Sequence, residues 1–381
     1  MKTKLLLTMA ATALLMACGG GGGGGGGGYS GLPIGGIPPG QQPDPGPNPN
    51  PNPAPNPNPN PNPNPNPNPN PSPISAHYKF LSFQQDRNPD TETAEKRYDD
   101  YIALLNREGA AGYRYLDGVT GGTIVTLQDQ FMMVKDIETT YTYEYKRFEV
   151  DILSSDGLPR LLQQMKEQGA KGMVYVKILG MIGLSASDNA EFAVLYRKDA
   201  GSSATYDYAA ADIPPTSADF VNLANAQGAN GFRPWATPVL RGLTQQFFIK
   251  DQGSAARYDL KALVSPLSVV GGTAEDVKAQ IRAQGATGYR LLKSRFMEDG
   301  KDFIFYLKDT MQSSSFEYEF LENPDPVFDI QEANAVQANS QTAIGLRYFG
   351  LPDSPIFFRS LNCTGPLCVS PDGKEIEDGS S

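Results

Sequence analysis

One internal repeat constrains the fold of this chain more than any other feature. The motif Gly-Ala-x-Gly, followed directly by a large apolar residue, occurs four times along the sequence. The glycine pairs are Gly109 and Gly112, Gly169 and Gly172, Gly228 and Gly231, and Gly285 and Gly288. Successive copies are 60, 59 and 57 residues apart. Such a constant period predicts tandem copies of one structural unit.

The sequence before each glycine pair has the pattern of an amphipathic helix. In the second copy, Leu161, Leu162 and Met165 recur at helical spacing. We expect the first glycine of each pair to end the helix in the left-handed conformation. The second glycine then gives the chain the freedom to turn closely against the helix and into a strand.

Three strands are expected after each helix. The middle one is apolar on both faces and ends in Lys-Asp, as in residues 131–136 and 303–309, which is typical of a buried central strand. The last one alternates aromatic and acidic residues, as in Tyr143-Glu144-Tyr145, so that rings face the core and carboxylates face water. Residues 77–83 look like a leading copy of this last strand.

These patterns predict an α+β fold of four tandem helix-strand-strand-strand repeats with mainly antiparallel sheet. A unit of this size is marginally stable alone, so neighbouring units should pack together, in a linear array or in two pseudo-symmetric pairs. The expected domain covers residues 77–323, and residues 324–381 are expected to form an irregular tail. The expected units are 77–150, 151–211, 212–264 and 265–323.

The repeat is similar to a small, widespread bacterial domain of unknown function. In that family a tryptophan often follows the second glycine, and the corresponding residues here are Tyr113, Met173, Phe232 and Tyr289. The resemblance implies a fold pattern and carries no activity with it.

The N-terminus has the three parts of a secretion signal. Lys2 and Lys4 precede an apolar run from Leu5 to Leu15, which is too short to span a bilayer. Leu15-Met16-Ala17-Cys18 resembles the lipobox of bacterial lipoproteins. The resemblance implies that residues 1–17 are removed and that Cys18 carries acyl chains such as palmitate. Two or more chains anchor a protein stably. The alternative is an ordinary signal peptide that happens to contain a cysteine.

Residues 18–76 are expected to form a disordered stalk after the lipidated cysteine. The run Gly19–Gly28 is flexible, whereas alternating Asn and Pro in residues 48–71 favour an extended rod. Residues 38–73 can reach on the order of 100 Å.

Lipoproteins retained at the inner membrane usually carry Asp where this chain has Gly19, so the outer membrane is favoured. The glycine run also resembles the tether of neisserial surface-exposed lipoproteins. A neutral expanded linker and a Pro-rich partner ligand are the alternatives.

The three cysteines divide into one predicted lipid site and one predicted disulfide. Cys363 and Cys368 are separated by four residues, and in an oxidising compartment they are expected to close a small loop. That spacing differs from the Cys-x-x-Cys redox motif, and no second Cys or His pair accompanies it to form a zinc site. We expect no metal and no cofactor.

Composition argues against catalysis and against nucleic acid. The formal charge of −10 disfavours a phosphate backbone as partner, and His77 is the only histidine. The repeated carboxylates fit solvated faces, and Lys135-Asp136 and Lys308-Asp309 fit turn chemistry. The chain is therefore not expected to be an enzyme. A glycan-active enzyme using two carboxylates is the alternative.

The functional hypothesis is a binding module, held to the membrane by its N-terminal lipid. In the leading version it is displayed on the cell surface and acts in an adhesin-like manner on an unknown macromolecule, either a protein or a glycan. In the alternative it faces the periplasm as an envelope structural or assembly factor. Ligand-binding residues are unknown from sequence. Trp235, between Pro234 and Pro238, breaks the repeat pattern and either marks a site or reflects drift.

Overall fold

A computed structural model describes residues 75–86, 94–122, 126–148, 156–180, 192–237, 239–240, 243–297, 300–322, 330–350 and 355–371. All of them belong to one compact unit within Pro65–Ser381. The predicted signal peptide, Cys18 and the stalk up to residue 74 lie outside the described residues. Within the described ranges, no helix combines the length and the apolar character needed to cross a bilayer.

The described chain contains five helices and five antiparallel sheets, so the predicted count of four units is not confirmed. Each unit contributes a strand, a helix and then the remaining strands of one sheet. The first unit has β1 (His77–Asp86), α1 (Ala94–Ala110), β2 (Arg114–Gly122) and β3 (Thr126–Lys135). The second has β4 (Tyr141–Phe148), α2 (Gly157–Gly169), β5 (Met173–Gly180) and β6 (Phe192–Asp199). The third has β7 (Tyr206–Asp212), α3 (Ser217–Gly228), β8 (Arg233–Ala236), β9 (Val239–Leu240) and β10 (Leu243–Asp251).

The fourth unit has β11 (Tyr258–Val264), α4 (Ala274–Ala286), β12 (Arg290–Met297) and β13 (Lys301–Asp309), with a short 3-10 turn at Pro266–Ser268. The fifth has β14 (Ser315–Phe320), α5 (Ile330–Thr342), β15 (Arg347–Gly350) and β16 (Ile356–Leu361), followed by a 3-10 turn at Pro366–Cys368. Part of the expected irregular tail is therefore a complete helix and two strands. The repeat is hard to see there because Thr342 replaces the first glycine before Gly345.

The sheets confirm the expected central strands and mainly antiparallel pairing. In every unit the last strand lies between two others of its sheet, as in the order β1-β3-β2. In the first four units this is the strand predicted from the apolar Lys-Asp pattern. The alternating aromatic strand pairs inside the unit that follows it, because β4 pairs with β6 and β11 pairs with β13. The unit is therefore strand-helix-strand-strand, and β1 is the first strand of the first unit.

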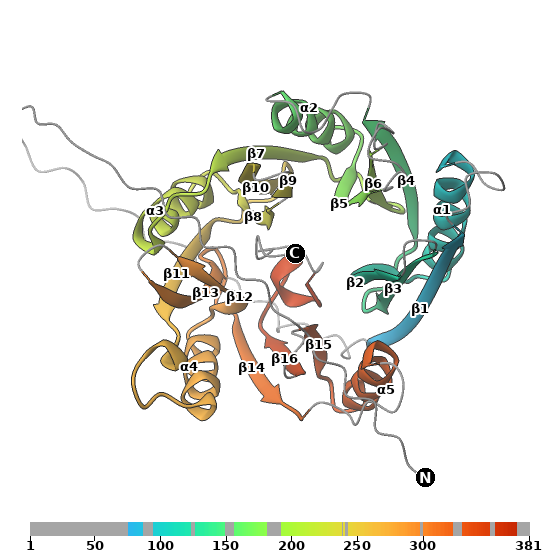
Figure 1. Ribbon diagram of the computed structural model, residues 1–381. Coiled ribbons are helices and arrows are strands. Elements are labelled where there is room, and N and C mark those ends of the chain that lie inside the picture. Colours follow the sequence, from blue (N-terminus) through green and yellow to red (C-terminus); the bar gives the residue numbers. More distant parts are fainter. Residues whose placement is uncertain are drawn as a thin grey trace, which may run out of the picture. The chain divides into compact units, whose positions relative to one another are not determined.

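The five units close into a ring, which is neither of the two arrangements expected from the sequence (Figure 1). Each helix packs on the first strand of the next unit: α1 on β4, α2 on β7, α3 on β11 and α4 on β14. The last helix, α5, packs on β1 and joins the two ends. At this closure Tyr78 and Met132 share a buried apolar cluster with Leu346 and Phe357. Burial of such surface is the main favourable term in folding.

Asparagine side chains fasten neighbouring units together. Asn106 and Asn225 each accept a backbone N–H and donate to the C=O of one residue on the next unit's first strand, with distances of 2.6–3.2 Å. Asn339 on α5 makes the same pair of bonds to Tyr78, both of 2.8 Å. Ring closure therefore uses the same contact as two of the internal boundaries.

Buried tyrosines make a second contact between units. The hydroxyl of Tyr143 accepts the backbone N–H of Tyr115 at 2.7 Å, beside an irregularity in β2. Tyr208 and Tyr318 do the same across later boundaries, and Tyr78 accepts the N–H of Tyr348 at 2.7 Å. These are the inward-facing rings of the alternating strand, so the predicted inside face is confirmed and its hydroxyls satisfy otherwise unpaired backbone donors.

The two glycines of each pair have different roles from those expected. The second glycine adopts the left-handed conformation, with φ of 89° at Gly112 and 86° at Gly231. The first lies within the helix, where a methyl group would overlap a carbonyl oxygen of the next unit's first strand, as at Gly109 against Tyr141. Close approach between units, rather than helix termination, requires the first glycine.

Replacement of Asn339 by alanine tests the ring closure. Loss of both bonds to the backbone of Tyr78 is expected to lower the free energy of unfolding by about 1–3 kcal/mol, as should Asn225→Ala at an internal boundary. Asn230→Ala is the matched control, because its amide bonds only Ala226 within its own unit. Urea unfolding measures all three. An Asn339→Ala protein as stable as the Asn230→Ala protein would contradict closure.

Candidate functional site

The middle of the ring is surrounded by arginines. Strands β2, β5, β8, β12 and β15 lie on the inner side of the ring in Figure 1. The residue that follows the glycine pair and its apolar neighbour begins, or nearly begins, this strand in each unit. It is arginine in four of the five units: Arg114, Arg233, Arg290 and Arg347.

The second unit keeps its arginine on the neighbouring strand. Val174 occupies the repeat position on β5, and its cross-strand partner on β6 is Arg197. In the first unit the same pair is Arg114 opposite Val134, and in the third it is Arg233 opposite Ile249. The guanidinium and the apolar side chain have exchanged strands, so every unit brings one arginine to the same cross-strand pair.

Acidic residues lie beside these arginines. Asp136 is fully buried and forms a two-bond ion pair with Arg114, at 2.9 and 3.1 Å. Asp199 accepts from Nε of Arg197 at 3.0 Å. The interpretation of Lys135-Asp136 as turn chemistry is therefore incomplete. Asp309 does fulfil that role by accepting two backbone N–H groups.

The C-terminal loop (residues 362–371) enters the middle of the ring (Figure 1). Its cysteines, Cys363 and Cys368, form the predicted disulfide. Three arginines donate to its carbonyl oxygens: Arg114 to Ser370 at 2.6 Å, Arg290 to Pro366 at 3.3 Å, and Arg347 to Cys368. The N–H of Ser370 also donates to Asp136 at 3.0 Å.

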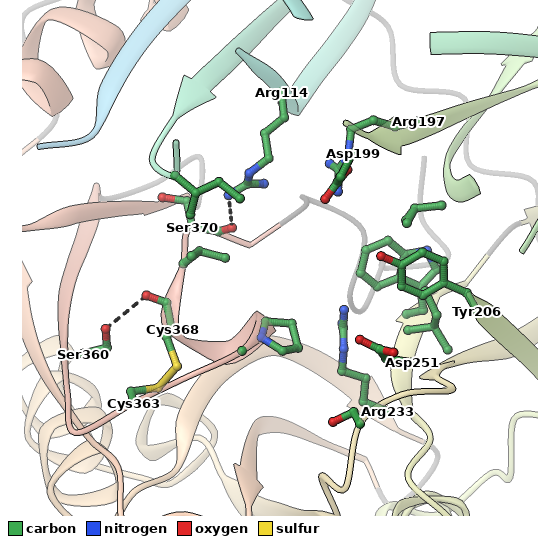
Figure 2. A pocket seen from close by; sticks show the side chains of 18 of the residues that line it. Arg114, Arg197, Asp199, Tyr206, Arg233, Asp251, Ser360, Cys363, Cys368 and Ser370 are labelled. Atoms are coloured by element: carbon green, nitrogen blue, oxygen red, sulfur yellow. Dashed lines mark hydrogen bonds and ion pairs between the residues drawn. A yellow bond between two sulfur atoms is a disulfide. The ribbon is translucent and has the colours of Figure 1, made fainter. Parts of the chain in front are cut away.

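A cavity of about 490 Å³ lies between this loop and the second and third units. Figure 2 shows Arg197, Asp199, Arg233 and Asp251 on one side of an open space and the disulfide and Ser370 on the other. Four arginines and two aspartates line it, so the lining is cationic in an otherwise acidic protein. The three arginines Arg114, Arg197 and Arg233 are at least nine-tenths buried. Guanidinium groups in such surroundings attract anions strongly.

Phenols complete the lining as neutral hydrogen-bond donors. Burial raises the pKa of Tyr206 to about 12, the charge of Asp199 adds to the shift, and Arg197 opposes it. Burial likewise raises the pKa of Tyr141, against the opposing effect of Arg114 and Arg197. Tyr141 is 1% exposed, and its hydroxyl makes no hydrogen bond to any described residue. Both phenols therefore stay protonated at neutral pH.

Trp235, which breaks the repeat pattern, lies in the cavity wall. Its Nε1–H donates to the C=O of Tyr175 at 3.1 Å, and the guanidinium of Arg233 lies 4.5 Å from its ring centroid. The indole side chain of Trp235 therefore fixes the third unit to the second and holds Arg233 in place. A position that departs from a repeat can mark a site, and Trp235 lines the candidate cavity.

The structure brings only some of the sequence-based candidates together. The disulfide lines the cavity, while the eight repeat glycines shape helix ends and boundaries between units. The arginines were missed, although three of the four recognised motifs end in Tyr-Arg or Phe-Arg. Recurrence of a charged residue at the start of a buried strand was the available signal.

Comparisons with known proteins add no family to this picture: no family model, no curated protein and no solved structure matches the chain. Among the described residues there is no group of three or more His, Cys, Asp or Glu side chains placed to hold a metal ion.

Exchange of residues between strands tests the arginine arrangement. Arg197→Val is expected to destabilise the protein by about 1–3 kcal/mol, because it leaves the half-buried carboxylate of Asp199 without its ion-pair partner. The double variant Val174→Arg with Arg197→Val places the guanidinium where other units have it and should recover most of that loss. Chemical denaturation of the two variants measures the difference. Equal instability of the single and double variants would contradict the equivalence of the two positions.

Proposed function

We propose that this chain is a non-enzymatic binding module, tethered to the outer membrane by a lipid on Cys18 and displayed at the cell surface. The observation that carries the binding role is the central cavity, where buried arginines from several units converge. Its volume lies within the range of roughly 300–1,000 Å³ that is common for ligand pockets. The lipobox-like segment and the long stalk support the tethered, displayed position.

The lining of the cavity suits holding a ligand rather than transforming it. Arg114 and Asp136 neutralise each other in a buried pair, and Arg197 is paired with Asp199. The phenols of Tyr141 and Tyr206 are kept neutral by burial. Groups of these kinds donate and accept hydrogen bonds in fixed positions, which gives selectivity for a ligand of matching charge.

Display at the cell surface would explain the length of the stalk. A spacer with a reach on the order of 100 Å carries a domain beyond the polysaccharide that surrounds an outer membrane. The ring then offers its cavity to macromolecules outside the cell, and an adhesin-like role follows. A periplasm-facing envelope factor would use the same stalk to reach the cell wall.

Protease treatment of intact cells tests this placement. The ring domain should be released as a C-terminal fragment, identified by mass spectrometry, while a periplasmic control protein stays intact. Cells producing Cys18→Ser should not retain the protein at the membrane. Protection of the ring until the outer membrane is broken would overturn surface display and favour the periplasmic role.

A further inference from the structure

Resting on the proposed binding function, we propose that the central cavity binds an acidic sugar, with Arg197 and Arg233 holding its carboxylate. Both arginines lie on the side of the cavity opposite the C-terminal loop (Figure 2). They are 6% and 8% exposed, so a ligand carboxylate would meet them largely away from water. A planar guanidinium matches a carboxylate with two parallel hydrogen bonds.

The C-terminal loop shows what the inward-facing arginines bind. Arg114, Arg290 and Arg347 each donate to a carbonyl oxygen of that loop, and Cys368 accepts a further hydrogen bond from the Ser360 hydroxyl at 3.0 Å. These positions are thus built to receive oxygen acceptors from the middle of the ring. A ligand carboxylate on the second and third units would receive the same kind of contact.

The two aspartates of the cavity lining favour a ligand that also carries hydroxyl groups. Asp199 and Asp251 line the same side of the cavity as the two arginines. A carboxylate accepts hydrogen bonds and cannot donate them, so a simple anion would make no hydrogen bond to these aspartates. Sugar hydroxyls donate to carboxylates and accept from phenols. Tyr141 adds an independent indication, because its buried hydroxyl lines the cavity and makes no hydrogen bond within the described chain.

Aromatic side chains give the cavity the apolar surface that a sugar ring also needs. Tyr206, Trp235 and Tyr258 line the cavity and present apolar faces beside the charged groups. A sugar ring has a comparably mixed surface, with apolar C–H faces and a polar edge. The chemistry favours a carboxylated, hydroxylated ring, such as a uronic or sialic acid, whether free or at the end of a glycan chain. A cavity of about 490 Å³ admits an end group of this size.

Calorimetric titration of the purified full chain tests this assignment with D-glucuronate, D-glucose, acetate and glutamate as probes. Glucuronate should bind saturably, whereas glucose lacks the carboxylate and acetate lacks the hydroxyls, so both should bind at least about tenfold more weakly. Glucuronic acid at the non-reducing end of an oligosaccharide distinguishes a polymer-borne ligand from a free sugar by higher affinity.

Matched variants assign the binding to the cavity. Arg233→Gln and Arg197→Val should each weaken glucuronate binding about tenfold or more, and Val174→Arg with Arg197→Val should recover it. Arg359→Gln is the control, since that arginine is partly exposed and pairs with Glu317 outside the cavity. Unfolding midpoints confirm that each variant is folded. Asp251→Asn removes a carboxylate that is proposed to accept sugar hydroxyls, so it should also weaken glucuronate binding.

The outcomes separate this inference from the proposed function. Equal binding of acetate and glucuronate, or an unchanged affinity in folded Arg233→Gln, would overturn the acidic-sugar assignment. Binding of glutamate that is lost in Arg233→Gln would overturn the sugar class while leaving a binding module in place. Failure of surface display concerns the location of the protein and leaves the titration result untouched.

Discussion

Each helix in the described part of the chain packs against the first strand of the next unit, and the rest of the structure depends on that contact. In the first four units the approach is so close that the helix needs glycine where it meets the strand, at Gly109, Gly169, Gly228 and Gly285. In α5 this position is Thr342. Asparagine amides then bond the strand backbone in both directions, and tyrosine hydroxyls accept backbone donors from the preceding unit. Because the contact is repeated at α5 and β1, five units close and neither end of the series is left uncovered.

Closure explains why charged side chains can be buried at the middle. Five units direct arginines to one region, where a lone guanidinium would carry a large desolvation cost. That cost is offset by Asp136 and Asp199 and by carbonyl oxygens of the C-terminal loop. Between the loop and the second and third units, these arginines line a cationic cavity. The proposed ligand chemistry follows from this lining.

The sequence was informative wherever a local pattern determines a local structure. Apolar runs ending in Lys-Asp predicted the central strands, and alternation predicted the buried rings of Tyr143 and Tyr208. The fifth unit was missed because Thr342 replaces the repeat glycine. The arginine site was missed because facing residues come from separate units, and the Val174 and Arg197 exchange preserves the site while breaking the sequence pattern. Ring closure is a long-range property that no short window contains.

The distance between α5 and β1 tests the closed ring most directly. In a chain that carries Cys18→Ser, spin labels on cysteines introduced at Lys79 and Ser340 report the distance between α5 and β1. A second pair of labels, at Lys261 and Ala226, occupies the equivalent positions on β11 and α3. Electron paramagnetic resonance should give matching short distances for the two pairs, since Asn339 and Asn225 make the same contact. A much longer distance for the first pair, as in an open array of five units, would contradict the ring and the shared arginine site.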